Sequence, residues 1–173
     1  MLRKLELSDA KEMLKWMHDE SVVGLLPTHF NEMTIEDCGK FIKKSWEDQK
    51  NIHFAVTDEE DKYLGTISLK NIDEKNLTAE YAVVLGKSAI GRGIAKKATD
   101  DILKYAFDKM KLDRVYLCVF SDNIRAVKFY QKYGFQYEGT FRSHMYGAYD
   151  NVRHDLQWYG ILREEFTKRM SEV

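Results

Sequence analysis

Several features that mark specialised protein classes are scarce in this sequence. It holds two cysteines, Cys38 and Cys118, which are far apart and belong to no C-x-x-C pair. This spacing argues against a metal or redox site and predicts reduced thiols. No apolar run approaches the roughly 18 residues that a membrane span needs, and no apolar segment follows the first basic residues as it would in an export signal. We therefore expect a cytoplasmic protein.

Charge of one sign is also lacking. The chain has 27 Lys and Arg against 28 Asp and Glu, which gives a net charge of -1 at pH 7. A balance this close provides no general attraction to nucleic acid or to an anionic membrane, so neither is expected as a partner. A site for an anion would have to be built locally.

The chain does have enough apolar residues for one core. Hydrophobic residues make up 44% of its 173 residues and aromatic residues 13%, so it can bury enough surface to offset its conformational entropy. It contains one proline and shows no internal repeat or low-complexity linker. Residues 1–173 are therefore expected to form a single domain.

The hydrophobic periodicity predicts an alternation of strands and helices. Strand-like runs at 52–58, 63–73 and 77–86 are separated by polar turns, which is typical of an antiparallel meander. A helical stripe over 93–110 would then connect the meander to a parallel strand at 114–120. The full predicted order is β-α-α-β-β-β-α-β-α-β-β with a helical tail. It predicts a mixed α/β (α+β) fold with a mostly antiparallel central sheet flanked by helices.

Local signals place the ends of several of these elements. Thr34 followed by Asp37 predicts a capped helix that runs to about residue 46. Asn123, or Asp122 before it, would cap a later helix that Gly134 ends. Residues 21–33 contain the single proline and an irregular apolar pattern, so we expect a loop or a broken helix there.

The stretch AIGRGIAKK, residues 89–97, lies between a strand and the start of the 93–110 helix. The first turn of a helix presents free backbone N–H groups and the positive end of the helix dipole, which favour anions. Gly91 and Gly93 would let a ligand approach the backbone, and Ala95 keeps the first turn narrow. The alternative is an ordinary glycine loop with solvated basic side chains. The basic side chains here are Lys87, Arg92, Lys96 and Lys97.

Two common phosphate-binding motifs do not fit this stretch. The Walker A pattern G-x-x-x-x-G-K-S/T is absent, and the dinucleotide pattern G-x-G-x-x-G/A would have Lys96 at its last position. The stretch also follows a meander instead of opening a βαβ unit. ATP and NAD are therefore disfavoured as ligands.

Two other motifs resemble a known family. IGRGIA, residues 90–95, resembles the Gln/Arg-x-x-Gly-x-Gly/Ala pattern that binds coenzyme A in the GCN5-related N-acetyltransferases (GNAT), with Ile90 replacing the Gln or Arg. NIRAVKFYQKYGF, residues 123–135, is similar to that family's N-x-x-A-x-x-x-Y-x-x-x-G-F segment. The runs AEYAVVL, EGTFR and YGILREEF resemble the branch that includes ribosomal-protein N-terminal, polyamine and aminosugar acetyltransferases.

This resemblance implies a GNAT-like sheet with a bulge or splay at the cofactor cleft and acetyl-coenzyme A as co-substrate, with no metal. Backbone groups of the 90–95 segment would cradle the pyrophosphate, and the pantetheine arm would lie beside the strand that ends at Leu85. Asn123 would bind that arm, and the Tyr130 hydroxyl would protonate the leaving thiolate. The implied cofactor-binding residues are Val83, Val84, Leu85, Ile90, Gly91, Arg92, Gly93, Ile94, Ala95, Asn123 and Tyr130.

Tyr130 and Glu80 are the candidate catalytic residues. Asn123 and Tyr130 are two helical turns apart, about 10 Å along one face, so one helix could contact both pantetheine and sulfur. Asn123 could instead serve only as a helix cap, and Tyr130 only as a core aromatic. Glu80 interrupts an apolar strand and could take a proton from the amine, directly or through water. The alternative for Glu80 is a solvated or ion-paired carboxylate.

The resemblance further implies the activity. The chain would transfer an acetyl group from acetyl-coenzyme A to a primary amine by direct attack in a ternary complex. The acceptor would be a protein N-terminus, an aminosugar or a polyamine, with His29, Phe30, Tyr146 and Tyr149 as candidate pocket residues. A non-catalytic acyl-coenzyme A binding or sensing module is the alternative. The C-terminal strands and tail are a candidate homodimer contact.

Overall fold

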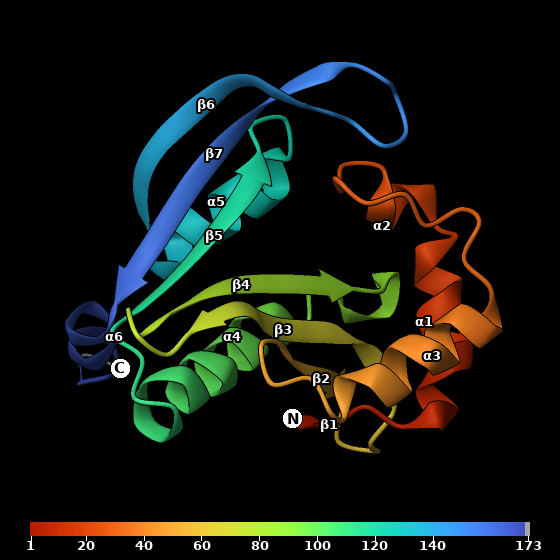
Figure 1. The fold of residues 1–173 in the computed structure, drawn as a ribbon, viewed down its shortest axis with the longest axis horizontal. Coiled ribbons are helices and arrows are strands. Elements are labelled where there is room, and N and C mark those ends of the chain that lie inside the picture. The colour runs from red at the N-terminus through yellow and green to blue at the C-terminus, as the bar shows by residue number, and fades with distance from the viewer. Residues whose placement is uncertain (172–173) are drawn as a thin grey trace.

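A computed structural model describes residues 1–171 (Figure 1). Its strands are β1 (Leu2–Lys4), β2 (Ile52–Thr57), β3 (Tyr63–Asp73), β4 (Thr78–Leu85), β5 (Arg114–Phe120), β6 (Gln136–Tyr146) and β7 (Arg153–Leu162). Its helices are α1 (Ala10–Met17), α2 (Glu20–Val23), α3 (Ile35–Ser45), α4 (Ile94–Lys104), α5 (Ile124–Tyr133) and α6 (Arg163–Ser171). This is the predicted order, with α2 as a short helix inside the expected broken segment.

The strands of residues 1–171 form one seven-stranded sheet in the order β1-β2-β3-β4-β5-β7-β6. Every neighbouring pair is antiparallel except β4 and β5, which run parallel and are joined through α4. The mixed, mostly antiparallel sheet flanked by helices is therefore confirmed.

Strands β4 and β5 separate soon after they meet. Their register holds only three pairs, Thr78 with Arg114, Ala79 with Val115 and Glu80 with Tyr116. Beyond them β4 continues to Leu85 and β5 to Phe120 without pairing with each other. Figure 1 shows the two strands diverging. This confirms the splay that the family resemblance implied.

The helix ends follow the local signals in the sequence. The Thr34 hydroxyl accepts a hydrogen bond from the Asp37 N–H, and Asp37 in turn accepts from the Thr34 N–H, which completes a capping box for α3. The helix that begins after Gly93 changes to a π-helical turn at Tyr105–Lys109, so the predicted 93–110 helix is continuous but not α-helical throughout.

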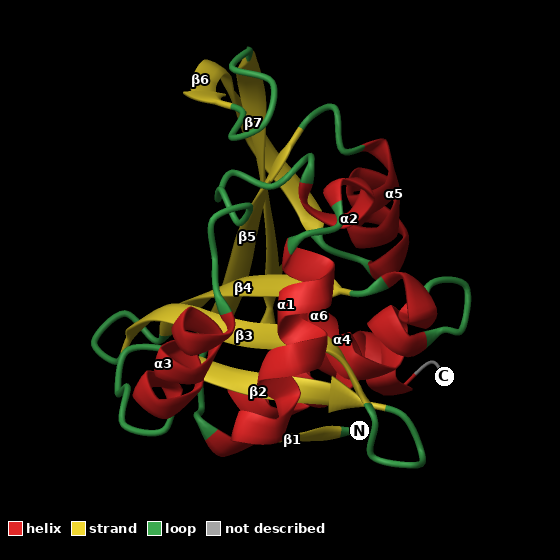
Figure 2. Cartoon of the chain, turned by 90° about the vertical axis from the view of Figure 1, so that its right-hand side faces the viewer, coloured by secondary structure: helices red, strands yellow, loops and turns green. Residues whose placement is uncertain are grey.

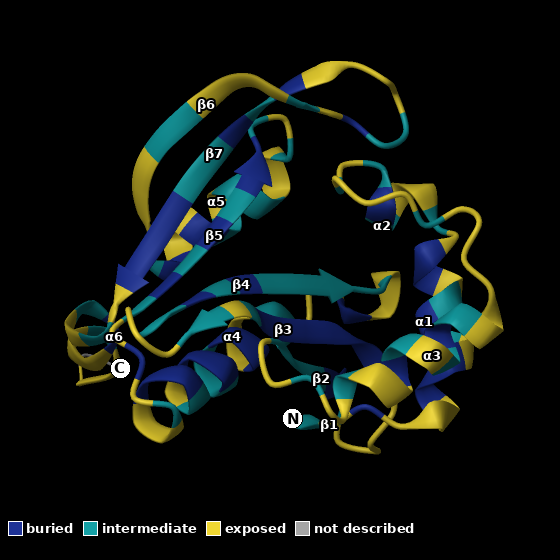
Figure 3. Cartoon of the chain, in the orientation of Figure 1, coloured by how far each residue is buried: buried dark blue, intermediate teal, exposed yellow. Residues whose placement is uncertain are grey.

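Two apolar clusters hold the sheet against its helices. Figure 2 shows the helices beside the sheet, and Figure 3 shows buried segments along β3 and β7. The larger cluster joins β2–β5 and β7 to α4, α5 and α6. It includes Ile67, Ile102 and Tyr159, which are fully buried. The smaller one packs α1 and α3 against the β1–β4 half, with Met13 and Ile42 at its centre. Within residues 1–171 no helix combines the length and the apolar character that crossing a membrane requires.

Candidate active site

The splayed edge of β4 forms the first wall of the candidate site. On one side Ile67, Thr66 and Gly65 of β3 pair with Val83, Val84 and Leu85 of β4. On the other side β4 has no strand neighbour beyond Glu80. Its free edge faces the gap where β4 and β5 separate, which we call the wedge. Because side chains alternate along a strand, Val83 packs with the α4 and α5 cluster and Val84 with the α1 and α3 cluster. The end of β4 thus borders both faces of the sheet.

The start of α4 forms the second wall and has features that favour an anion. Gly91 and Gly93 have φ values of +75° and +73°, a region that favours glycine, and a Cβ at either would meet nothing within 4 Å. The first helical bond of this end runs from the Lys97 N–H to the Gly93 carbonyl, so the N–H groups just before it are free of that ladder. Open space therefore lies over free donors at a positive helix end, as an anion requires.

A groove of about 340 Å³ begins at this wall and runs toward α5 and α6. Its cationic side chains are Lys96, Arg125, Lys132 and Arg169. Arg125 and Lys132 are seven residues apart, which places them on the same face of α5. Arg169 comes from α6, where its guanidinium lies 4.4 Å from the centre of the Tyr133 ring. Arg125, Lys132 and Arg169 were not predicted from the sequence. The seven-residue spacing could have identified the first two, but no local signal points to Arg169.

A second groove, of about 450 Å³, continues from the first into the wedge. It contains Asn123 and Tyr130 of α5, and residues of α2 and its following loop form the far wall. The two grooves share Leu85, Ile90, Ala95, Arg125 and Phe129, so they form one channel from the glycine cradle to the splay. All of the predicted cofactor contacts line this channel except Arg92, whose Nη1 donates to the Ser88 carbonyl at 3.3 Å.

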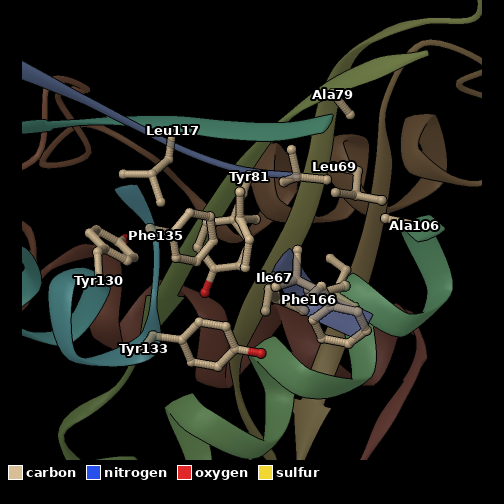
Figure 4. Close-up of a cluster of buried hydrophobic side chains, with 14 of the residues drawn as sticks. Ile67, Leu69, Ala79, Tyr81, Ala106, Leu117, Tyr130, Tyr133, Phe135 and Phe166 are labelled. Atoms are coloured by element: carbon tan, nitrogen blue, oxygen red, sulfur yellow. The ribbon is translucent and has the colours of Figure 1, made fainter. Parts of the chain in front are cut away.

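Tyr130 is both a core aromatic and a groove residue. Its side chain packs against Tyr81, Phe129 and Phe135. Figure 4 shows Tyr130 with Tyr81 and Phe135 in the buried cluster. Burial raises the pKa of Tyr130 above its ordinary value, and Cys118 adds to the shift. Among residues 1–171 its hydroxyl has no hydrogen-bond partner. A protonated hydroxyl is therefore available to a group in the wedge.

Asn123 also serves two purposes. Its side-chain oxygen accepts from the Ala126 N–H at 3.2 Å and caps α5, as the capping alternative expected. Its side-chain nitrogen donates to no other group of residues 1–171, while the residue lines the groove. Capping therefore leaves a donor for a ligand.

Comparison with known proteins identifies the family of the chain. The family model described as an acetyltransferase (GNAT) domain matches residues 1–136. The chain belongs to the GNAT acetyltransferase family. An uncharacterised N-acetyltransferase of Bacillus licheniformis is 29% identical over 168 residues, which cover 95% of this chain and 93% of the relative. A spermidine N(1)-acetyltransferase of Vibrio cholerae is 26% identical over 157 residues, with 88% of each chain covered.

The fold has solved counterparts. The crystal structure of spermidine N-acetyltransferase from Vibrio cholerae in complex with CoA and spermine matches with a TM-score of 0.88 at 22% identity, over 96% of this chain and 97% of that one. The family resemblance is thus confirmed, and this GNAT protein is an acetyl-coenzyme A dependent acyltransferase. Within residues 1–171 there is no group of three or more metal-ligating side chains.

Glu80 lies on the other face of β4 in this acetyltransferase. Its neighbour Tyr81 faces the α5 cluster, so Glu80 faces the opposite side, and it lines neither part of the cofactor channel. Its carboxylate accepts from Lys70 Nζ at 3.0 Å and from Asn71 Nδ2 at 2.7 Å. Burial raises the pKa of Cys118, and the Glu80 charge raises it further. Glu80 is therefore ion-paired, as the alternative expected, and it lies next to the wedge.

Two segments expected to flank the cleft of this GNAT protein do meet. The His29 and Tyr149 rings stack with centres 5.1 Å apart, and the Phe30 N–H donates to the Tyr149 hydroxyl at 2.9 Å. The loop after α2 therefore contacts the tip of the β6–β7 hairpin. Tyr146 does not join them: its exposed ring lies 4.5 Å from the Arg153 guanidinium.

His154 holds this hairpin tip in place, a role that the sequence analysis missed. Its Nδ1 lies 2.7 Å from an Asp122 oxygen and its Nε2 2.9 Å from an Asp150 oxygen. Burial lowers the pKa of His154, but the hydrogen bonds to the two carboxylates outweigh this and the pKa is raised overall. A protonated imidazole can donate to both, which links the tip to the turn before α5.

Proposed function

We propose that this acetyltransferase transfers the acetyl group to a primary amine by direct attack in a ternary complex. The observation that carries the proposal is that the mostly buried Tyr130 has a hydroxyl without a hydrogen-bond partner among residues 1–171, at the splayed end of a channel that begins at Gly91 and Gly93. A covalent acyl-enzyme is less well supported, because burial and the nearby Glu80 charge raise the pKa of Cys118 and disfavour its nucleophilic thiolate form.

The channel supplies groups for each part of acetyl-coenzyme A. The N–H groups of the 90–95 segment and the side chains of Arg125 and Lys132 would hold the phosphates. The free edge of β4 would pair with the amides of the pantetheine arm, and Asn123 would donate to it. The bound group supplies an activated acetyl thioester; the protein supplies its position.

The chemistry then needs two proton movements. The amine nitrogen bonds to the acetyl carbon while the carbon–sulfur bond breaks, which leaves an N-acetylamine and a thiolate. Tyr130 would protonate the thiolate, since its raised pKa keeps the hydroxyl protonated at neutral pH. The proton that the amine loses would pass through water to Glu80 on the acceptor side of β4. Solvent exchange would then return Tyr130 and Glu80 to their starting forms.

Replacing Glu80 by Gln tests its role as base. We expect kcat/KM near neutral pH to fall about 10-fold, with the loss shrinking at alkaline pH where solvent already supplies neutral amine. Glu74→Gln, in the exposed turn after β3, is the matched control and should leave the rate unchanged. A pH–rate profile of Glu80→Gln that overlays the wild-type profile would remove Glu80 from the mechanism.

The activity itself can be tested with an assay for free thiol. Purified chain, acetyl-coenzyme A and one of three amines, a tetrapeptide, glucosamine or spermidine, should release thiol with at least one amine at a rate proportional to enzyme. Calorimetry should show coenzyme A binding in the same preparation. Tight binding with no thiol release from any amine would instead support the binding or sensing module.

A further inference from the structure

A third cavity lies on the opposite face of β4 from the cofactor channel, and the established family membership does not specify what it binds. It measures about 320 Å³ and shares Val83 and Val84 with the channel. Most of its wall is apolar and comes from α1, α3, the loop before α3 and β4. Its apolar lining comprises Met13, Trp16, Met17, Phe30, Met33, Cys38, Phe41, Ala82, Val83 and Val84.

The few charged groups of this cavity are already paired. Lys70 is bound to Glu80 at 3.0 Å, and Asp37 lies 3.3 Å from Lys40 Nζ and completes the α3 capping box. Burial lowers the pKa of His53, so this ring is neutral near pH 7. A polycation would bring several ammonium groups and find only one carboxylate among the described lining residues, that of Asp37 at the rim, which already contacts Lys40.

The two hydroxyl groups on its β3 wall, those of Ser68 and Thr66, are also engaged. Ser68 Oγ lies 2.7 Å from His53 Nδ1, and Thr66 Oγ1 lies 2.6 Å from the Tyr63 hydroxyl. A sugar ring buried here would leave much of its own hydrogen-bonding capacity unmet, at a cost for each unpaired group. Two of the three acceptor classes therefore fit the cavity poorly.

The mouth of the cavity opens to solvent. Thr28 is exposed, Asp37 is half-buried, and Met33 is 36% exposed at the same rim. A chain attached to a group inside the cavity can leave through this mouth. Methionine side chains in the wall are flexible and polarisable, which suits apolar groups of varied shape.

We propose that this cavity recognises an apolar side chain next to the reacting amine, as at the N-terminus of a peptide that begins with Met or Leu. The inference rests on the proposed function. The amine would sit at Val83 and Val84, where the cavity meets the channel, and the apolar side chain would fill the space between α1 and α3. The peptide would continue out past Met33.

The test compares Met-Ala-Ala-Ala-amide with Gly-Ala-Ala-Ala-amide in the thiol assay. We expect kcat/KM to be about 30-fold higher for the Met peptide, since burial of one such side chain is worth about that factor. Methioninamide and glycinamide are compared in the same assay to separate recognition of a small amine from recognition of a peptide. A similar preference for the methionine compound, at a lower rate than with the peptides, supports the peptide form. Spermidine or glucosamine reacting faster than the Met peptide would overturn the inference and leave the transferase assignment intact.

A charge at the mouth provides a second test. Met33→Glu should reduce the preference for the Met peptide at least 5-fold and raise the rate with spermidine, because it places a carboxylate beside the apolar cavity. Met170→Glu on α6, at 44% exposure, is the matched control. Calorimetric titration of the Met and Gly peptides into the coenzyme A-bound chain ranks them without turnover. Equal affinities there would also overturn the inference, even if no amine reacted.

Discussion

Tyr130→Phe is expected to lower kcat about 100-fold with little change in the affinity for coenzyme A. The substitution removes one hydroxyl and keeps the ring that packs on Tyr81 and Phe135. That hydroxyl has no partner among residues 1–171, so its loss breaks no hydrogen bond that the fold depends on. Steady-state rates with saturating amine, together with calorimetry for coenzyme A, measure the two quantities separately.

The control for this variant is Tyr159→Phe. Tyr159 belongs to the same buried cluster, but its hydroxyl is bonded to Gln131 and Gln157 and lies outside the channel. We expect Tyr159→Phe to reduce thermal stability somewhat and to keep kcat. A wild-type kcat in Tyr130→Phe would exclude the general-acid role and leave Tyr130 as a packing residue.

Gly93→Asp is expected to weaken coenzyme A binding about 30-fold relative to Gly93→Asn. Asn and Asp tolerate the left-handed conformation at φ +73° about equally and have nearly the same shape, so both variants carry the same backbone cost. They differ by one negative charge placed over the open space at the start of α4. Such a charge beside a pyrophosphate costs about 2 kcal/mol at the effective dielectric of a protein surface.

Salt dependence separates this repulsion from a loss of fold. The affinity difference between the two variants should shrink as ionic strength rises, because exposed charges are screened within about 10 Å at 0.1 M salt. Thermal unfolding without ligand should be alike for both. Equal coenzyme A affinities at low salt would show that the phosphates lie away from Gly93 and that the 90–95 segment is an ordinary glycine loop.

The sequence predicted those features that depend on neighbours along the chain. The Thr34 cap, the Gly134 helix end and the small residues at the start of α4 each act within a few positions, so their patterns can be recognised locally. The separation of β4 from β5 was predicted from the family resemblance instead. The periodicity of β4 indicates that the strand is buried, but it does not indicate where its pairing with β5 ends.

The features that it missed join distant segments. Arg169 reaches the cofactor channel from the last helix, and His154 meets Asp122 across 32 positions. The apolar cavity needs α1, α3 and β4 in their folded positions before it exists, and its residues read in sequence only as ordinary core. The sequence marks Glu80 as a charge within the apolar run of β4, but its Lys70 and Asn71 partners depend on the register with β3.

The three-pair contact between β4 and β5 also bears on aggregation. An open strand edge with free N–H and C=O groups can recruit another chain, and proteins commonly cover or charge such edges. Here the free edge of β4 lies inside the molecule, bordered by α2 and its loop on one side and α5 on the other. A second polypeptide strand with bulky side chains would meet these walls, whereas a slender amide-bearing chain would not. We therefore expect the same enclosure to hinder pairing of this edge with a second chain and to admit a slender ligand such as a pantetheine arm.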